Sequence, residues 1–133
     1  MIRAILVTMI PTVALAQTAS CPQDLPENSV VATKVPPGWV AASPNGARLD
    51  GGGMLRGNPK EMQYLVPANS RKFRGGGSST WKFSPGEEKW FFCTYGRATI
   101  ELSKQMNNRA AICIVTSRDD KVGALAGLEV TCK

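Results

Sequence analysis

Hydrophobic and polar residues alternate most clearly in the second half of the chain. Residues 81–83 (WKF) alternate around one lysine, which predicts a half-buried strand. Residues 89–95 (KWFFCTY) carry aromatic or cysteine side chains on both faces, as a central strand does. A tight reversal at Gly96-Arg97 leads into the alternating residues 98–102, so these two segments are predicted to form a hairpin.

The remaining carboxy-terminal segments extend this pattern. Residues 111–116 (AICIVT) predict a buried strand, 117–121 a solvated turn, and 127–131 a last strand. Four strands in succession at short spacing favour an antiparallel meander. The expected fold class is therefore mostly β, an antiparallel sandwich or a small barrel.

The first half of the chain carries weaker signals. Residues 29–35 (SVVATKV) are rich in β-branched side chains and predict a first strand, whereas residues 43–60 predict brief strands joined by loops. Another short strand is expected at 64–67. The glycine triplets at 51–53 and 75–77 are interpreted as flexible connections, the second within a mobile loop, because glycine loses much backbone entropy inside an element.

The amino terminus resembles an export signal. A positive start at Arg3 and an apolar run ending in Ala14-Leu15-Ala16 predict a signal peptide over 1–16 and a single domain over 17–133. The run is too short for a membrane anchor. Cys21 as a lipidated amino terminus is the alternative, although the residues before it lack the usual leucine. The expected location is the periplasm.

Four cysteines remain after this cleavage, and an even number in an exported chain predicts two disulfides. Three connectivities are possible, and we favour Cys93–Cys113 together with Cys21–Cys132. The chain has no C-x-x-C pair and no histidine, so we expect neither a metal site nor a cofactor.

Charge and side-chain chemistry argue for binding rather than catalysis. Of 16 basic residues, 15 remain without Arg3, against 10 acidic ones, which favours an acidic partner surface. Export and the lack of a basic helix argue against nucleic acid. A proton-shuttling histidine is missing, and Glu87-Glu88 and Asp119-Asp120 fall in predicted turns, where solvated carboxylates are expected.

Two segments could contact a partner. Trp39 follows a Pro-Pro-Gly turn, where it either plugs one end of the sandwich or presents an aromatic surface, whereas Trp81 and Trp90 are expected in the core. The second segment is basic and precedes a glycine triplet. It consists of Arg71, Lys72, Phe73 and Arg74. Tryptophan and arginine are enriched at interface hot spots, so both segments are candidate binding sites.

These motifs together resemble a family of small periplasmic proteins of Gram-negative bacteria. The motifs are Cys21-Pro22, Pro37-Gly38-Trp39, a strand with Trp81, Trp90-x-x-Cys93-x-Tyr95, Ile100-x-Leu102 and Cys113. Some members lie beside type VI secretion effectors that attack peptidoglycan, and one serves as the immunity protein of an L,D-transpeptidase-like effector. The resemblance therefore implies a non-catalytic inhibitor of an exported cell-wall enzyme or toxin.

Two further functions stay open at this point. A periplasmic module that binds glycan or an anionic surface would suit the positive charge. An enzyme would need carboxylates that converge across a cleft, which the sequence neither excludes nor supports. The oligomeric state and the contact face do not follow from the sequence.

Overall fold

The computed structural model describes residues 15–41 and 46–133. Within these ranges the chain forms nine strands and one short 3-10 helix. Their bounds are β1 Gln17–Ser20, β2 Asp24–Leu25, β3 Ala47–Arg56, η1 Pro59–Glu61, β4 Asn69–Phe73, β5 Gly76–Lys82, β6 Lys89–Tyr95, β7 Ile100–Gln105, β8 Ile112–Asp119 and β9 Leu125–Cys132. No helix among these residues is long and apolar enough to cross a membrane.

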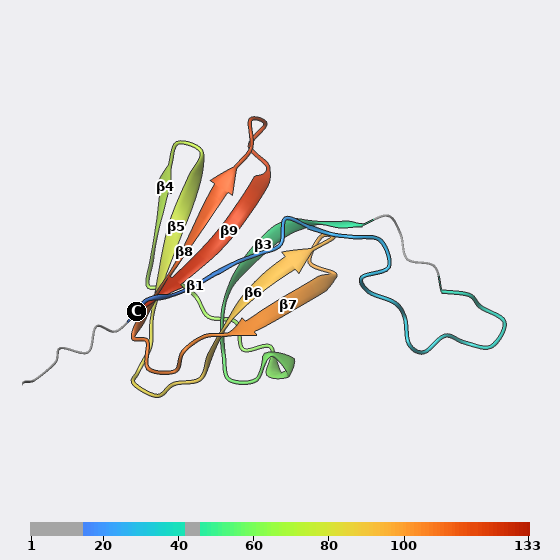
Figure 1. Cartoon of the computed structure of the whole chain (residues 1–133), viewed down its shortest axis with the longest axis horizontal. Coiled ribbons are helices and arrows are strands. Elements are labelled where there is room, and N and C mark those ends of the chain that lie inside the picture. Colours follow the sequence, from blue (N-terminus) through green and yellow to red (C-terminus); the bar gives the residue numbers. More distant parts are fainter. Residues whose placement is uncertain (1–14, 42–45) are drawn as a thin grey trace, which may run out of the picture.

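The strands form two sheets, and every strand pairing within them is antiparallel. Sheet 1 has the order β1-β9-β8-β5-β4, and sheet 2 has the order β2-β3-β6-β7. Figure 1 shows the two sheets meeting near β1 and β3 and diverging from there. The predicted antiparallel, disulfide-bonded β fold is confirmed. The predicted four-strand meander does not form, because the β6–β7 hairpin belongs to sheet 2 whereas β8 and β9 belong to sheet 1.

The core lies where the two sheets face each other. It contains Met54, Phe91 and Tyr95 from sheet 2, and Val115 and Val130 from sheet 1. The buried hydroxyl of Tyr95 donates a hydrogen bond of 2.7 Å to the carbonyl oxygen of Pro22. Tyr95 therefore fixes the chain where it crosses from β1 to β2.

The strand predicted at 29–35 is wrong. Residues 26–41 form no strand and leave the sandwich as a long excursion, coloured blue to cyan in Figure 1. Val30, Val31 and Val35 are exposed along it. β-branched residues favour a strand only where a neighbouring strand offers hydrogen-bonding and packing partners.

The first glycine triplet lies within a strand and the second spans a tight turn and the start of a strand, so their interpretation as flexible connections is also wrong. The first belongs to β3, where a Cβ on Gly52 would overlap the carbonyl oxygen of Phe92 and the Cδ2 of Leu128. β3 can therefore pass closely against sheet 1 only because Gly52 has no side chain. The second triplet supplies the turn glycine Gly75 (φ +82°) and the start of β5.

The predicted disulfide connectivity is wrong as well. The bridges are Cys21–Cys93 and Cys113–Cys132. Cys113 and Cys132 are direct cross-strand partners on β8 and β9, with Cα atoms 4.1 Å apart. The first bridge ties the segment after β1 to the middle of β6. Since the sulfur of Cys21 is bonded to Cys93, no thiol is left there for a lipid.

Lys89 is fully buried at the start of β6 and closes one end of the core. Its Nζ donates to the carbonyl oxygens of Glu87 (2.7 Å), Asn108 (2.9 Å) and Asn107 (3.3 Å), and lies 5.0 Å from the centroid of the Phe83 ring. Burial lowers the pKa of Lys89, and the Glu87 charge partly opposes that shift. The side chain thereby joins the loops before β6 and after β7.

Candidate functional site

A cleft of about 610 Å³ opens between the diverging sheets. Its floor contains Trp81, Val115 and Leu128, and Gly51 and Gly52 of β3 form one wall. The other wall comes from the β4–β5 hairpin, residues 69–82. The cleft exists because this part of the hairpin presents small polar side chains, which do not fill the space between the sheets.

Strand register determines which side chains enter the cleft. Lys72 pairs with Gly77, and Gly77 pairs with Ser117 on β8. Ser70 pairs with Ser79 in the same way, and Ser79 pairs with the core residue Val115. Residues that are directly opposite in a sheet share a face, so Ser70 and Lys72 belong to the inner face.

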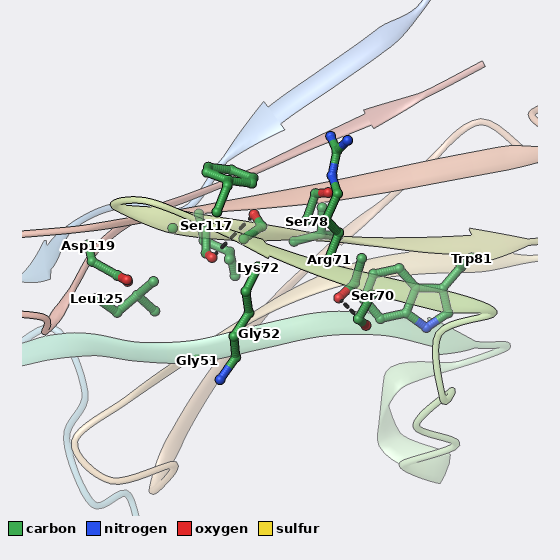
Figure 2. A pocket seen from close by; sticks show the side chains of 16 residues that line it. Gly51, Gly52, Ser70, Arg71, Lys72, Ser78, Trp81, Ser117, Asp119 and Leu125 are labelled. Atoms are coloured by element: carbon green, nitrogen blue, oxygen red, sulfur yellow. Dashed lines mark hydrogen bonds between the residues drawn. The ribbon is translucent and has the colours of Figure 1, made fainter.

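Figure 2 shows Lys72 pointing from β4 towards Gly51 and Gly52, while Arg71 points to the opposite side of the sheet. The hydroxyls of Ser70 and Ser79 form a hydrogen bond of 2.8 Å on the cleft side, drawn as a dashed line. The hydroxyl of Ser117 donates to the carbonyl oxygen of Gly77 at 3.3 Å. The cleft is therefore polar along the hairpin and apolar at its floor.

The basic segment predicted from the sequence lies at this site. Arg71, Lys72 and Phe73 line the opening, and all three are exposed on β4. Arg74 occupies the turn that joins β4 to β5, next to Gly75. The expected mobile loop is thus an ordered hairpin that divides its cations between the cleft and the outer face.

Trp39 is not part of this cleft. Its side chain is 75% exposed, and its backbone N–H donates to the carbonyl oxygen of Pro36 at 3.1 Å in the Pro-Pro-Gly turn. It therefore presents an aromatic surface and does not plug the sandwich. Of the other two tryptophans, Trp81 is buried as expected, and its Nε1 donates to the carbonyl oxygen of Leu65. Trp90 is only partly buried, and its Nε1 donates to Glu88.

The adjacent carboxylates serve the fold. Glu87 forms an ion pair with Arg56 and accepts a hydrogen bond from the backbone N–H of Ser84. Asp120 accepts from the backbone N–H groups of Ala124 and Val122 and pairs with Arg48 at 3.1 Å. The N–H of Ala124 contributes most to holding the pKa of Asp120 below its usual value, although desolvation opposes this shift.

Neither pair converges with a second carboxylate across the cleft. Asp119, the one acidic residue among the described residues that line it, is exposed, and its backbone N–H donates to the carbonyl oxygen of Gly75 in the β4–β5 turn. In the described ranges, no group of three His, Cys, Asp or Glu residues could hold a metal ion. All four cysteines are in disulfides. The cleft therefore offers shape, charge and hydrogen-bonding groups.

Sequence reasoning missed the cleft residues that are not charged. Gly51, Gly52, Ser70 and Ser79 become a site only through strand register, and their side chains carry no motif of their own. The available signal was the repetition of serine and glycine over residues 75–79, which is unusual for the inner face of a sandwich strand.

The open cleft of this disulfide-bonded β-sandwich, polar along one hairpin and apolar at its floor, has the chemistry of a binding surface. Residues 42–133 match the family model of the Type VI secretion system Tli immunity protein, so the chain belongs to that family. It is an immunity protein, an inhibitor of a type VI secretion effector, and its partner is the cognate effector protein. No curated protein and no solved structure matches the chain.

Proposed function

We propose that this immunity protein acts in the periplasm, where it binds its effector one to one, and that the effector is a cell-wall enzyme. The apolar run before residue 17 and two disulfides support an oxidising compartment. Disulfides and membership of the immunity family are consistent with an envelope location. The cell-wall target rests on the resemblance described above.

The proposed contact surface is the cleft together with β4 and its turn. The observation that carries this choice is the position of Lys72 in the cleft, with Arg71 and Arg74 on adjoining surfaces. Three cations around one opening give a positive potential that attracts an acidic partner and raises the association rate. Among the side-chain interactions of the described residues, no ion pair engages any of the three.

The test is binding and protection with charge-reversed variants. Arg71→Glu combined with Arg74→Glu should weaken binding to the cognate effector by at least tenfold and lower protection of cells that receive it. Lys60→Glu combined with Lys104→Glu is the matched control, because both lysines are exposed and lie outside the cleft. Equal affinities of the two double variants would contradict this surface.

Trp39 is proposed as a second, separate contact. A 75% exposed tryptophan next to the 92% exposed Val40 is a large apolar surface, of the kind that dominates interface energetics when a partner covers it. Trp39→Ala should therefore weaken effector binding without changing thermal stability. Unchanged affinity would restrict the interface to the cleft side.

The target class has its own test. Purified effector should change the chemical structure of isolated peptidoglycan sacculi, by cleaving bonds or by altering cross-links, and an equimolar amount of this protein should prevent that change. Inhibition at a one-to-one ratio would also establish the stoichiometry. An effector that leaves the peptidoglycan chemically unchanged would contradict the cell-wall assignment while leaving the immunity function in place.

A further inference from the structure

We propose that β4 accepts an extended acidic segment of the effector as an additional strand, so that sheet 1 grows from five strands to six in the complex. This inference rests on the proposed function and specifies the partner chemistry that the cleft side recognises. Addition of a strand to a sheet edge supplies affinity through main-chain hydrogen bonds and specificity through the alternating side chains.

β4 is an open edge. It ends the strand order of sheet 1, and among the described strands it pairs with β5 alone. All five of its residues are exposed, and none is a proline. Across residues 15–41 and 46–133, no backbone hydrogen bond to β4 comes from any strand other than β5. The side of β4 that faces away from β5 is therefore available to another chain.

Hairpin register identifies the free backbone groups. Phe73 and Gly76 flank a two-residue turn, which makes them a hydrogen-bonded pair, and such pairs recur at every second residue. The carbonyl oxygen of Arg71 points towards β5, in agreement with this register, because it lies 3.1 Å from the point that a Cβ on Gly77 would occupy. Consequently Ser70 and Lys72 direct their N–H and C=O groups outward.

The charges on β4 select the kind of strand that can bind. Arg71 points to the outer face and Lys72 into the cleft, so an added strand meets a cation on each face. Like charges that lie opposite each other destabilise a strand pair, and edge lysines oppose unwanted pairing for the same reason. A second copy of this chain would bring its own Arg71 and Lys72 to that edge, whereas an acidic segment would complement both.

The cleft gives such a strand a place for its side chains. Every second residue of an added strand would project to the same side as Ser70 and Lys72, above the floor formed by Trp81, Val115 and Leu128. Apolar side chains would reach the floor, while carboxylates would pair with the lysine at the rim. One segment would thereby occupy both the edge and the cleft.

The discriminating experiment compares Ser70→Pro with Ser70→Ala. Both variants lose the hydroxyl contact to Ser79, but only proline also removes the outward N–H. A proline whose missing N–H would face solvent is tolerated on an edge strand. Binding of the cognate effector should weaken at least tenfold more for Ser70→Pro than for Ser70→Ala, with equal thermal midpoints for the two variants.

Hydrogen exchange on the unmodified protein provides a second test that needs no variant. The N–H groups of Ser70 and Lys72 should exchange quickly in the free protein and at least tenfold more slowly in the complex. If wild type binds while these amides stay unprotected and the two Ser70 variants bind equally, strand addition is wrong and the proposed function stands. If wild type does not bind, the proposed function itself fails. A dimer formed through β4 without effector would show the occupant to be a second copy.

Discussion

The β8–β9 and β4–β5 hairpins belong to the same sheet and have the same inner face, yet sheet 2 covers only one of them. The β8–β9 hairpin presents Cys113, Val115 and Val130 to the core, all of them buried. Beyond Trp81, the β4–β5 hairpin presents serine, glycine and Lys72 instead. The size and polarity of the inner side chains therefore decide where the sandwich is closed and where it leaves a cleft.

This difference separates stability from recognition. Buried apolar side chains and disulfides hold the closed part, so changes there should lower the free energy of unfolding. Substitutions of exposed polar residues away from such features usually change the free energy of unfolding by less than about 0.5 kcal/mol. The β4–β5 hairpin can therefore vary with the effector while the scaffold stays folded.

The largest effect is expected from removing the Cys21–Cys93 bridge. It closes 72 residues, and the Cys21→Ala, Cys93→Ala double variant should lose about 2–5 kcal/mol of unfolding free energy. Urea unfolding of the oxidised proteins measures this loss. The Cys113→Ala, Cys132→Ala variant should lose less, because its bridge spans only 19 residues in the same chain-entropy relation. The reverse order would show that strain or residual structure outweighs loop closure.

Gly52→Ala tests the close packing of β3 against β9, where the closed part of the sandwich meets the cleft. The new methyl group would overlap backbone on β6 and Leu128 on β9, so β3 would have to move away, at a cost of about 1–3 kcal/mol. Gly51→Ala is the matched control, because its nearest neighbour is the rotatable hydroxyl of Thr94 at 2.9 Å. Thermal unfolding compares the stability of the two variants, and equal midpoints would contradict close packing at Gly52.

A smaller effect is expected from Asp50, which holds the β6–β7 turn on the closed side. Although desolvation raises the pKa of this carboxyl, hydrogen bonds from Thr94 and the Ala98 N–H leave it below the unfolded value of 3.8. The stabilisation is present above pH 3.8 and disappears as the pH falls through the folded-state pKa. Thermal midpoints between pH 2 and 6 should fall less steeply on acidification for Asp50→Asn than for wild type.

The sequence predicted those elements whose signal lies within the element. Residues 89–95 and 111–116 alternate or are continuously apolar, and both became strands of the core. The failures depend on partners distant in sequence. Residues 29–35 have strand-forming side chains but no neighbouring strand, and Gly52 acquires its role from Leu128, 76 positions later.

The candidate site was predicted only in its charges. Arg71, Lys72 and Arg74 stand out in composition, but which of them enters the cleft depends on the pairing of β4 with β5. The prediction of the disulfide pairing was wrong for the same reason, since Cys113 and Cys132 become neighbours only through the β8–β9 register. Register is a property of pairs of strands, and one isolated segment does not specify it.

The position of β9 in sheet 1 determines when this sheet can form during synthesis of the chain. This strand, residues 125–132, lies between β1 and β8 and supplies Cys132. A ribosome delivers β1 first and β9 after every other strand, so β1 has no partner until synthesis has reached residue 132. Pairings between such distant segments form slowly. A nascent chain that stops before residue 125 would lack the strand that connects β1 to the rest of sheet 1, and it would lack one of its two bridges.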